Sequence, residues 1–134
     1  MTEYFKGTSG KNIAYNKIIG SSPGLVFLGG FMSDMEGSKA MFLENYAKET
    51  GQGYLRFDYS GHGRSSGKFS DGTIGQWFTD AVDAIDTLTD GPQILIGSSM
   101  GGWIALLIAK KLPKLVGGIV TIAGAPDFTE DSIW

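Results

Sequence analysis

The chain contains no cysteine and only one histidine among its 134 residues. Without cysteine there is no disulfide framework, no thiolate zinc site and no cysteine nucleophile, and a single histidine excludes a multi-histidine metal centre. Charge is also sparse, since 11 Lys and Arg oppose 14 Asp and Glu and no basic patch forms. We therefore expect no metal, no cofactor and no nucleic-acid partner. The chemistry must come from oxygen groups, His62 and backbone amides.

Long hydrophobic runs are missing as well. The longest, at residues 103–109, is far shorter than the roughly 20 residues that a membrane-spanning helix requires. The first residues show neither a basic segment followed by an apolar core nor the Arg-rich composition of a transit peptide. These absences predict a protein without a membrane span, located in the cytoplasm.

Glycine is abundant, with 21 residues, but it separates apolar runs and forms no linker, so residues 1–134 are interpreted as one domain. Two short runs around a turn-rich segment at 7–11 predict an antiparallel hairpin. Beyond it, strand and helix patterns alternate, and the first strand of this series, 24–30, is apolar at every position, which predicts an α/β fold with a mostly parallel sheet. The expected strands are 24–30, 53–58, 93–97 and 115–123, and the expected helices are 38–51, 74–89 and 100–112.

A serine motif lies between one of these strands and the following helix. Gly97, Ser99 and Gly101 fit the pattern G-x-S-x-G. A tight strand-to-helix turn needs small neighbours, because a Cβ there would collide with the adjacent strand or helix, and the turn presents the hydroxyl above the sheet. The first N–H groups of the helix would stabilise negative charge at the same place. The placement favours Ser99 as a nucleophile over the alternative, a glycine-rich turn whose serine caps the helix.

A second glycine-containing loop, residues 28–33, leaves the first buried strand. In hydrolases of this architecture, an N–H of that loop and the N–H after the nucleophile form the oxyanion hole. Here the donors would be the backbone N–H of Phe31, or that of Met32, together with the N–H of Met100. Alone, the loop would be interpreted as a compact turn, but beside the serine motif the oxyanion role is favoured.

Two further patterns are interpreted as structural. The glycine-rich segment 58–67 has the wrong glycine spacing for a dinucleotide-binding turn, and no helix begins directly after it. Four aspartates lie along the polar side of the helix at 74–89, over nearly three turns, and cannot converge on one ion, so a solvated helix face is expected. They are Asp80, Asp83, Asp86 and Asp90.

Together, segments 29–31, 58–65 and 97–103 resemble the α/β-hydrolase superfamily. Segments 56–61 and 91–99 are similar to a bacterial and mitochondrial branch that includes palmitoyl-protein thioesterase and acyl-glucuronide esterase activities. The resemblance implies acyl transfer from an ester or thioester to Ser99, followed by hydrolysis, with a small molecule or an acylated protein as substrate and no cofactor.

The resemblance also implies a catalytic acid and a histidine that follow the serine along the chain. The only histidine, His62, precedes Ser99 and lies where the family's equivalent histidine is not the base, while Asp127 lies near a place that some members use for the acid. We therefore expect the N-terminal portion of a hydrolase, truncated after about six strands. Because an unassisted serine is a weak nucleophile, the chain alone should show little or no turnover.

The last expected strand is apolar on both faces, which suits a strand paired at both edges. As a terminal strand it would expose an adhesive edge that allows self-association. Two alternatives therefore stay open. One is a non-catalytic truncated hydrolase that acts as a binding or interaction protein, and the other is complementation by a second polypeptide that supplies the acid and the histidine.

Overall fold

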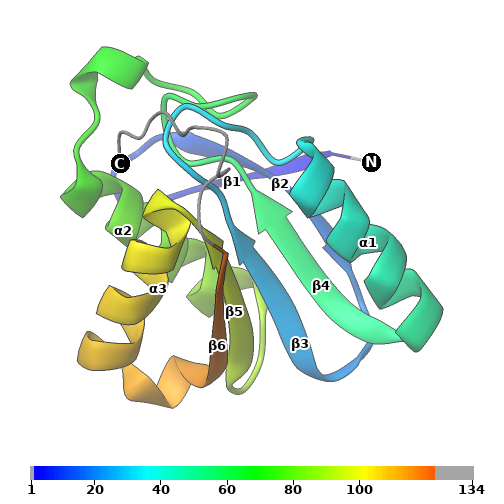
Figure 1. Cartoon of the computed structure of the whole chain (residues 1–134). Coiled ribbons are helices and arrows are strands. Elements are labelled where there is room, and N and C mark those ends of the chain that lie inside the picture. Colours follow the sequence, from blue (N-terminus) through cyan, green and yellow to red (C-terminus); the bar gives the residue numbers. More distant parts are fainter. Residues whose placement is uncertain (1, 123–134) are drawn as a thin grey trace, which may run out of the picture.

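In the computed structural model, which describes residues 2–122, six strands form one mixed sheet in the order β1-β2-β4-β3-β5-β6 (Figure 1). The strands are β1 (Glu3–Lys6), β2 (Asn12–Ile18), β3 (Ser21–Leu28), β4 (Gln52–Phe57), β5 (Gln93–Ser98) and β6 (Val116–Ile122). β2 pairs antiparallel with β1 and β4, and the remaining neighbours pair in parallel. The predicted α/β sheet, mostly parallel with an antiparallel N-terminal hairpin, is confirmed.

The helices of the described residues are α1 (Ser38–Thr50), α2 (Ile74–Leu88) and α3 (Met100–Lys111), with short 3-10 turns η1 (Phe69–Asp71) and η2 (Pro113–Leu115). They lie where the apolar periodicity predicted them. Gly51 ends α1 in the left-handed conformation, at φ 78°, as glycine commonly does at a helix end. Thr73 caps α2 by accepting the N–H of Gln76 at 3.1 Å. No described helix combines the length and apolarity needed to span a bilayer.

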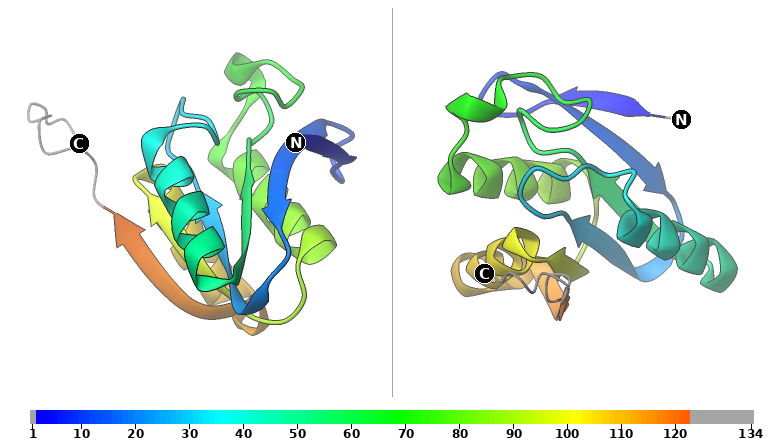
Figure 2. Two further views of the ribbon diagram at one scale, coloured as in Figure 1. Left: turned by 90° about the vertical axis from the view of Figure 1, so that its right-hand side faces the viewer. Right: turned by 45° about the horizontal axis from the view of Figure 1, so that its top comes forward.

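The second half of β3, residues 25–28, is apolar at every position because both of its faces are covered. Val26 and Leu28 pack with residues of α2 and α3, whereas Leu25 and Phe27 pack on the other face with residues of α1. Figure 2 shows α1 on one side of the sheet and α2 and α3 on the other. Because successive strand residues point to opposite faces, a strand covered on both sides must be apolar at every position. This arrangement confirms the expectation for the central strand.

The parallel strands β3, β4 and β5 direct their carboxyl ends to the same edge of the sheet (Figure 1). The segments that follow them, 29–37, 58–73 and the turn at Ser99, therefore lie together at that edge. In open α/β sheets this is the edge where ligands bind. The fold thus brings together the three motifs that the sequence singled out.

β6 is the outermost strand of the described sheet and pairs with β5 on one side. Val120 on β6 is half-exposed, and so are Trp103 and Leu106 on the outer face of α3. The expected exposure of the last strand is therefore confirmed for the described residues. The predicted end of this strand at Ala123, and Asp127, lie outside the described residues.

The prediction of a solvated aspartate face on α2 is wrong for Asp80, whereas Asp83 is partly exposed. Asp80 is fully buried and accepts the N–H of Ser60 at 2.8 Å and Nε2 of Gln76 at 2.9 Å. Asp83 accepts both the N–H and the hydroxyl of Thr8 at 2.9 Å. Ser60 and Thr8 donate from segments outside α2, so helical periodicity could not reveal these two contacts.

A partly buried ion pair ties β4 to α1. Arg56 places Nε and Nη2 each 2.8 Å from Oε1 of Glu44, and its Nη1 donates to the carbonyl of Met35 at 3.0 Å. Lys48 lies 3.3 Å from the other oxygen of Glu44. Burial disfavours the charged carboxylate, but the hydrogen bonds and charges of Arg56 and Lys48 outweigh it, so the pKa of Glu44 is lowered.

We expect Glu44→Gln to reduce stability at pH 7 by about 2 kcal/mol, because it removes a charge-assisted hydrogen bond. A lowered pKa in the folded state means that this contribution exists above the pKa of an unfolded glutamate and is lost as the pH falls through the folded value. Urea unfolding between pH 7 and pH 3 should therefore show the wild type and the variant converging in acid. Glu49→Gln, at an exposed position of the same helix, should change little. An equal difference for Glu44→Gln at both pH values would contradict the pair's role.

Candidate active site

Ser99 occupies the turn between β5 and α3 at φ 53° and ψ −115°. Non-glycine residues rarely adopt such a conformation, which costs of order 1–3 kcal/mol. The turn is held by two backbone hydrogen bonds, from Ser99 N–H to the carbonyl of Ile122 at 3.1 Å and from Gly102 N–H to the carbonyl of Ser99 at 2.9 Å. Ser99 precedes α3, yet its side chain makes no capping bond, and the residue is exposed. The helix-capping alternative is therefore wrong.

The two motif glycines allow the backbones to touch. A Cβ on Gly101 would collide with the carbonyl of Leu28 on β3, and a Cβ on Gly97 would collide with the carbonyl of Gly101. Backbone atoms cannot yield in the way that the end of a flexible side chain can. The spacing G-x-S-x-G is thus a steric requirement of the contact between β3, β5 and α3.

The loop after β3 runs directly against Ser99. A Cβ on Gly30 would lie 3.5 Å from Cβ of Ser99. Residues 30–33 form a turn in which the N–H of Ser33 donates to the carbonyl of Gly30 at 3.2 Å. Phe31 follows Gly30, and Met100 is the first residue of α3, where N–H groups have no partner within the helix. Within residues 2–122 neither of these two N–H groups has an acceptor.

The sequence offered two donors in this loop. The N–H of Met32 donates to Nε2 of His62 at 3.2 Å. The N–H of Met32 is therefore already used, whereas that of Phe31 has no acceptor within residues 2–122. The side chains of both loop residues are more than half exposed.

His62 is not arranged as a base. Its Nε2 accepts the N–H of Met32, so Nδ1 carries the proton and donates to the carbonyl of Ser60 at 3.1 Å. The ring is buried and lies edge-on to Tyr59, Phe69 and Trp77, with centroids 5.0 to 5.5 Å away. Both nitrogens of a neutral imidazole are thus engaged, in keeping with the sequence inference that this histidine is not the catalytic one.

Asp58 joins the loops, a role that the sequence interpretation missed. Its buried carboxylate accepts the N–H of Met35 at 2.7 Å and the N–H of Arg64 at 2.9 Å. Burial raises the pKa of Asp58 and outweighs these two backbone hydrogen bonds, which act in the opposite direction. The available signal was Gly63, whose φ is 47° and where a Cβ would collide with this carboxylate.

A cavity of about 450 Å³ lies beside Ser99. Its lining includes Gly30 and Phe31 from the loop after β3, and Lys39 and Ala40 from the start of α1. It offers room for one side of a substrate next to the hydroxyl. No motif predicted this cavity, because its wall comes from segments far apart in the chain.

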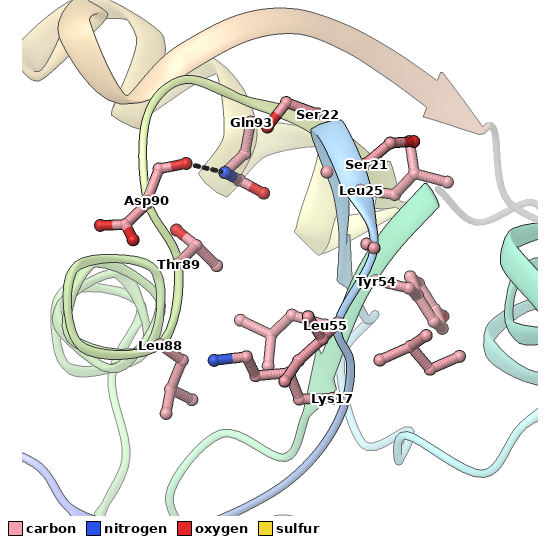
Figure 3. Close-up of a pocket in the computed structure, with 15 residues that line it drawn as sticks. Lys17, Ser21, Ser22, Leu25, Tyr54, Leu55, Leu88, Thr89, Asp90 and Gln93 are labelled. Carbon is pink, nitrogen blue, oxygen red and sulfur yellow. Dashed lines mark hydrogen bonds between the residues drawn. The ribbon is translucent and has the colours of Figure 1, made fainter. Parts of the chain in front are cut away.

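A second cavity, of about 350 Å³, lies at the opposite edge of the sheet (Figure 3). Its lining includes Lys17 at the end of β2, Tyr54 near the start of β4 and Gln93 at the start of β5. The side chain of Gln93 is tied to the carbonyl of Asp90 at 2.8 Å. Since β5 runs from Gln93 to Ser98, the length of the strand separates this cavity from Ser99, and it takes no part in the candidate site.

Comparisons of the sequence and of the structure with known proteins match the same family. A model of the Alpha/beta hydrolase family matches residues 25–133. Palmitoyl-protein thioesterase ABHD10, mitochondrial, of Homo sapiens is 46% identical over 116 residues, which are 87% of this chain and 38% of that protein. The chain therefore spans less than half the length of this curated relative.

Solved structures agree with the sequence match. Alpha/beta hydrolase domain-containing protein 10 from mouse superimposes with a TM-score of 0.89 at 36% identity, and the match covers 97% of this chain and 52% of that one. An esterase from Exiguobacterium antarcticum gives a TM-score of 0.80 at 26% identity and covers 94% and 47% of the two chains. The described sheet and helices thus correspond to about half of each solved chain.

Alanine substitutions at two neighbouring glycines of the serine turn should differ in their effect on stability. Gly101→Ala should destabilise the chain by about 3 kcal/mol or prevent folding, because its Cβ meets backbone atoms. Gly102→Ala should change stability by less than about 1 kcal/mol, because its Cβ meets the Thr121 side chain at 3.4 Å and alanine favours the helix. Urea unfolding of both variants checks this difference, and equal effects would refute the account.

Proposed function

The chain belongs to the alpha/beta hydrolase family, and we propose that Ser99 is the nucleophile with which it attacks carboxylic esters or thioesters. The observation that carries this proposal is the strained turn at Ser99, which leaves the hydroxyl exposed and outside any capping bond. Strain of this kind persists only where the surrounding structure enforces it, and it gathers at functional sites. Here two glycines and two backbone hydrogen bonds enforce it.

The proposed reaction has two acyl transfers. Oγ of Ser99 loses its proton and bonds to the carbonyl carbon of the substrate, and the alcohol or thiol departs with a proton as the acyl-enzyme forms. Water then attacks the acyl-enzyme and releases the carboxylic acid and the free serine. In both steps negative charge develops on the carbonyl oxygen, where the N–H groups of Phe31 and Met100 would donate to it.

The base and the acid are proposed to lie outside this chain. His62 is the only histidine, and both of its nitrogens are engaged. A serine hydroxyl without a neighbouring base is a weak nucleophile, and loss of triad members costs several orders of magnitude in rate. We therefore expect little or no turnover from the chain alone. A role for Asp127 as the acid stays a prediction.

The substrate class follows from the relatives and from the cavity. The human relative is named a palmitoyl-protein thioesterase, and the cavity beside Ser99 has room for a substrate group. We propose an acyl ester or thioester of a small molecule or a protein. The absence of a cofactor and a cytoplasmic location stay predictions from the sequence, and the human relative carries a mitochondrial designation.

A second candidate function is binding without catalysis, or assembly with a polypeptide that supplies the missing groups. The observation that favours it is the outer edge of β6, which pairs with no strand of residues 2–122, together with the exposed side chains of Val120, Trp103 and Leu106. Unpaired apolar edges readily pair with another strand. Self-association through the same edge belongs to this alternative.

Treatment with a fluorophosphonate and an aryl acetate tests the proposal. Any adduct on the chain, located by mass spectrometry, should map to Ser99, disappear in Ser99→Ala and persist in Ser70→Ala, a matched exposed serine. Turnover should lie at least about 10³-fold below that of a complete hydrolase. An adduct on another residue would refute Ser99 as the nucleophile. Full turnover that Ser99→Ala abolishes would refute the external base.

Mixing distinguishes the alternatives. The partner to mix with this chain is the part of the human relative that lies outside the matched segment. Aryl acetate hydrolysis that appears only on mixing, and only with Ser99 intact, would support complementation. A chain that binds an acyl ligand with or without this partner and never cleaves it would support the binding function instead.

A further inference from the structure

We infer that His62 is a positioning residue for the oxyanion loop, because its unprotonated Nε2 holds the N–H of Met32 and so leaves the N–H of Phe31 available beside Ser99. The inference rests on the proposed function of Ser99 and adds to it a residue that does not touch the substrate. It also gives a reason for a buried histidine with no part in proton transfer.

The backbone conformation of the loop at residues 30–33 requires stabilisation by contacts from outside the loop. Met32 has a positive φ of 61°, a conformation that a residue with a long side chain rarely adopts. Phe31 and Met32 are the central residues of the turn closed between Gly30 and Ser33. The bond to His62 fixes the orientation of the peptide group that joins these two central residues. With the closing bond of the turn on the other side, the backbone of Phe31 is held from both ends.

The position of the imidazole is fixed from the opposite side of the site. Nδ1 donates to the carbonyl of Ser60 at 3.1 Å, and this carbonyl also accepts Nε1 of Trp77 at 3.1 Å. The N–H of Ser60 donates to the buried carboxylate of Asp80 at 2.8 Å. A chain of hydrogen bonds thus runs from α2 through Ser60 and His62 to Met32.

The aromatic residues around His62 also contact the side chain of Phe31 in the same loop. The ring of Phe31 lies 5.0 Å from the ring of Phe69 and 5.9 Å from that of Trp77, both edge-on, and these two rings also contact His62. Edge-on aromatic pairs of this geometry are attractive. The cluster therefore holds the loop at two successive residues, by the ring of Phe31 and by the N–H of Met32.

Two substitutions in the chain separate this role from simple packing. His62→Phe keeps a ring in the cluster but has no acceptor, whereas His62→Gln offers an amide oxygen near the place of Nε2. Amide hydrogen exchange of Met32 measures the hold directly. Binding of phenylboronic acid, whose boron takes Oγ of Ser99 as a fourth ligand while the hydroxyl proton passes to solvent, measures the oxyanion site.

In His62→Phe we expect exchange of the Met32 amide to become at least about tenfold faster, and the boronic acid to bind about tenfold more weakly, since one oriented hydrogen bond is lost. His62→Gln should restore most of the Met32 amide protection and most of the affinity for the boronic acid. The Met35 amide, which Asp58 holds at 2.7 Å, should stay protected in both variants. A folded His62→Phe that keeps Met32 protection and boronate affinity within twofold of the wild type would overturn the inference.

If His62→Phe does not fold, the protonation of the imidazole in the wild type still tests the inference. Because the chain has one histidine, nitrogen NMR of the wild type gives a single pair of ring signals. We expect the proton on Nδ1, and a proton on Nε2 would overturn the inference. A wild type that binds no boronic acid, but whose Met32 protection depends on His62, would refute the proposed function and still support the hold.

Discussion

The site depends on the direct contact between the backbone at the start of α3 and the end of β3. Gly101 permits this approach because a Cβ there would collide with the carbonyl of Leu28. Gly97 permits α3 to begin against β5 because a Cβ there would collide with the carbonyl of Gly101. At this contact Ser99 has a strained φ of 53°, and the residue is exposed. The same turn places the start of α3, with the N–H of Met100 that has no partner within the helix, and Gly30 next to Ser99.

Buried polar groups around this contact hold loops in place instead of reacting. Asp58, Asp80 and His62 each accept a backbone N–H from a segment distant in the chain. Such groups are stable in the interior because each charge or lone pair has a donor. The raised pKa of Asp58 accordingly reflects burial at a structural junction. A perturbed titratable group in this cleft is thus no sign by itself of a catalytic one.

The fold could be predicted because its signals are local. Strands covered on both faces are apolar throughout, as at Leu25 to Leu28, and Gly51 ends α1 by a conformation that glycine adopts at little cost. The serine turn could be predicted because a steric constraint fixes the spacing of its glycines. The engagement of the Met32 N–H could not, because its acceptor is His62, thirty residues away. The burial of Asp80 escaped prediction for the same reason, since Ser60 supplies its donor from another loop.

In the proposed mechanism, the turn presents Oγ of Ser99 to a carbonyl whose oxygen meets two backbone N–H groups. A crystal structure of the chain with phenylboronic acid tests this arrangement most directly. We predict boron bonded to Oγ of Ser99, with a boronate oxygen about 2.7–3.1 Å from the amide nitrogens of Phe31 and Met100. Boron on another side chain, or a boronate oxygen that points away from both amides, would contradict it.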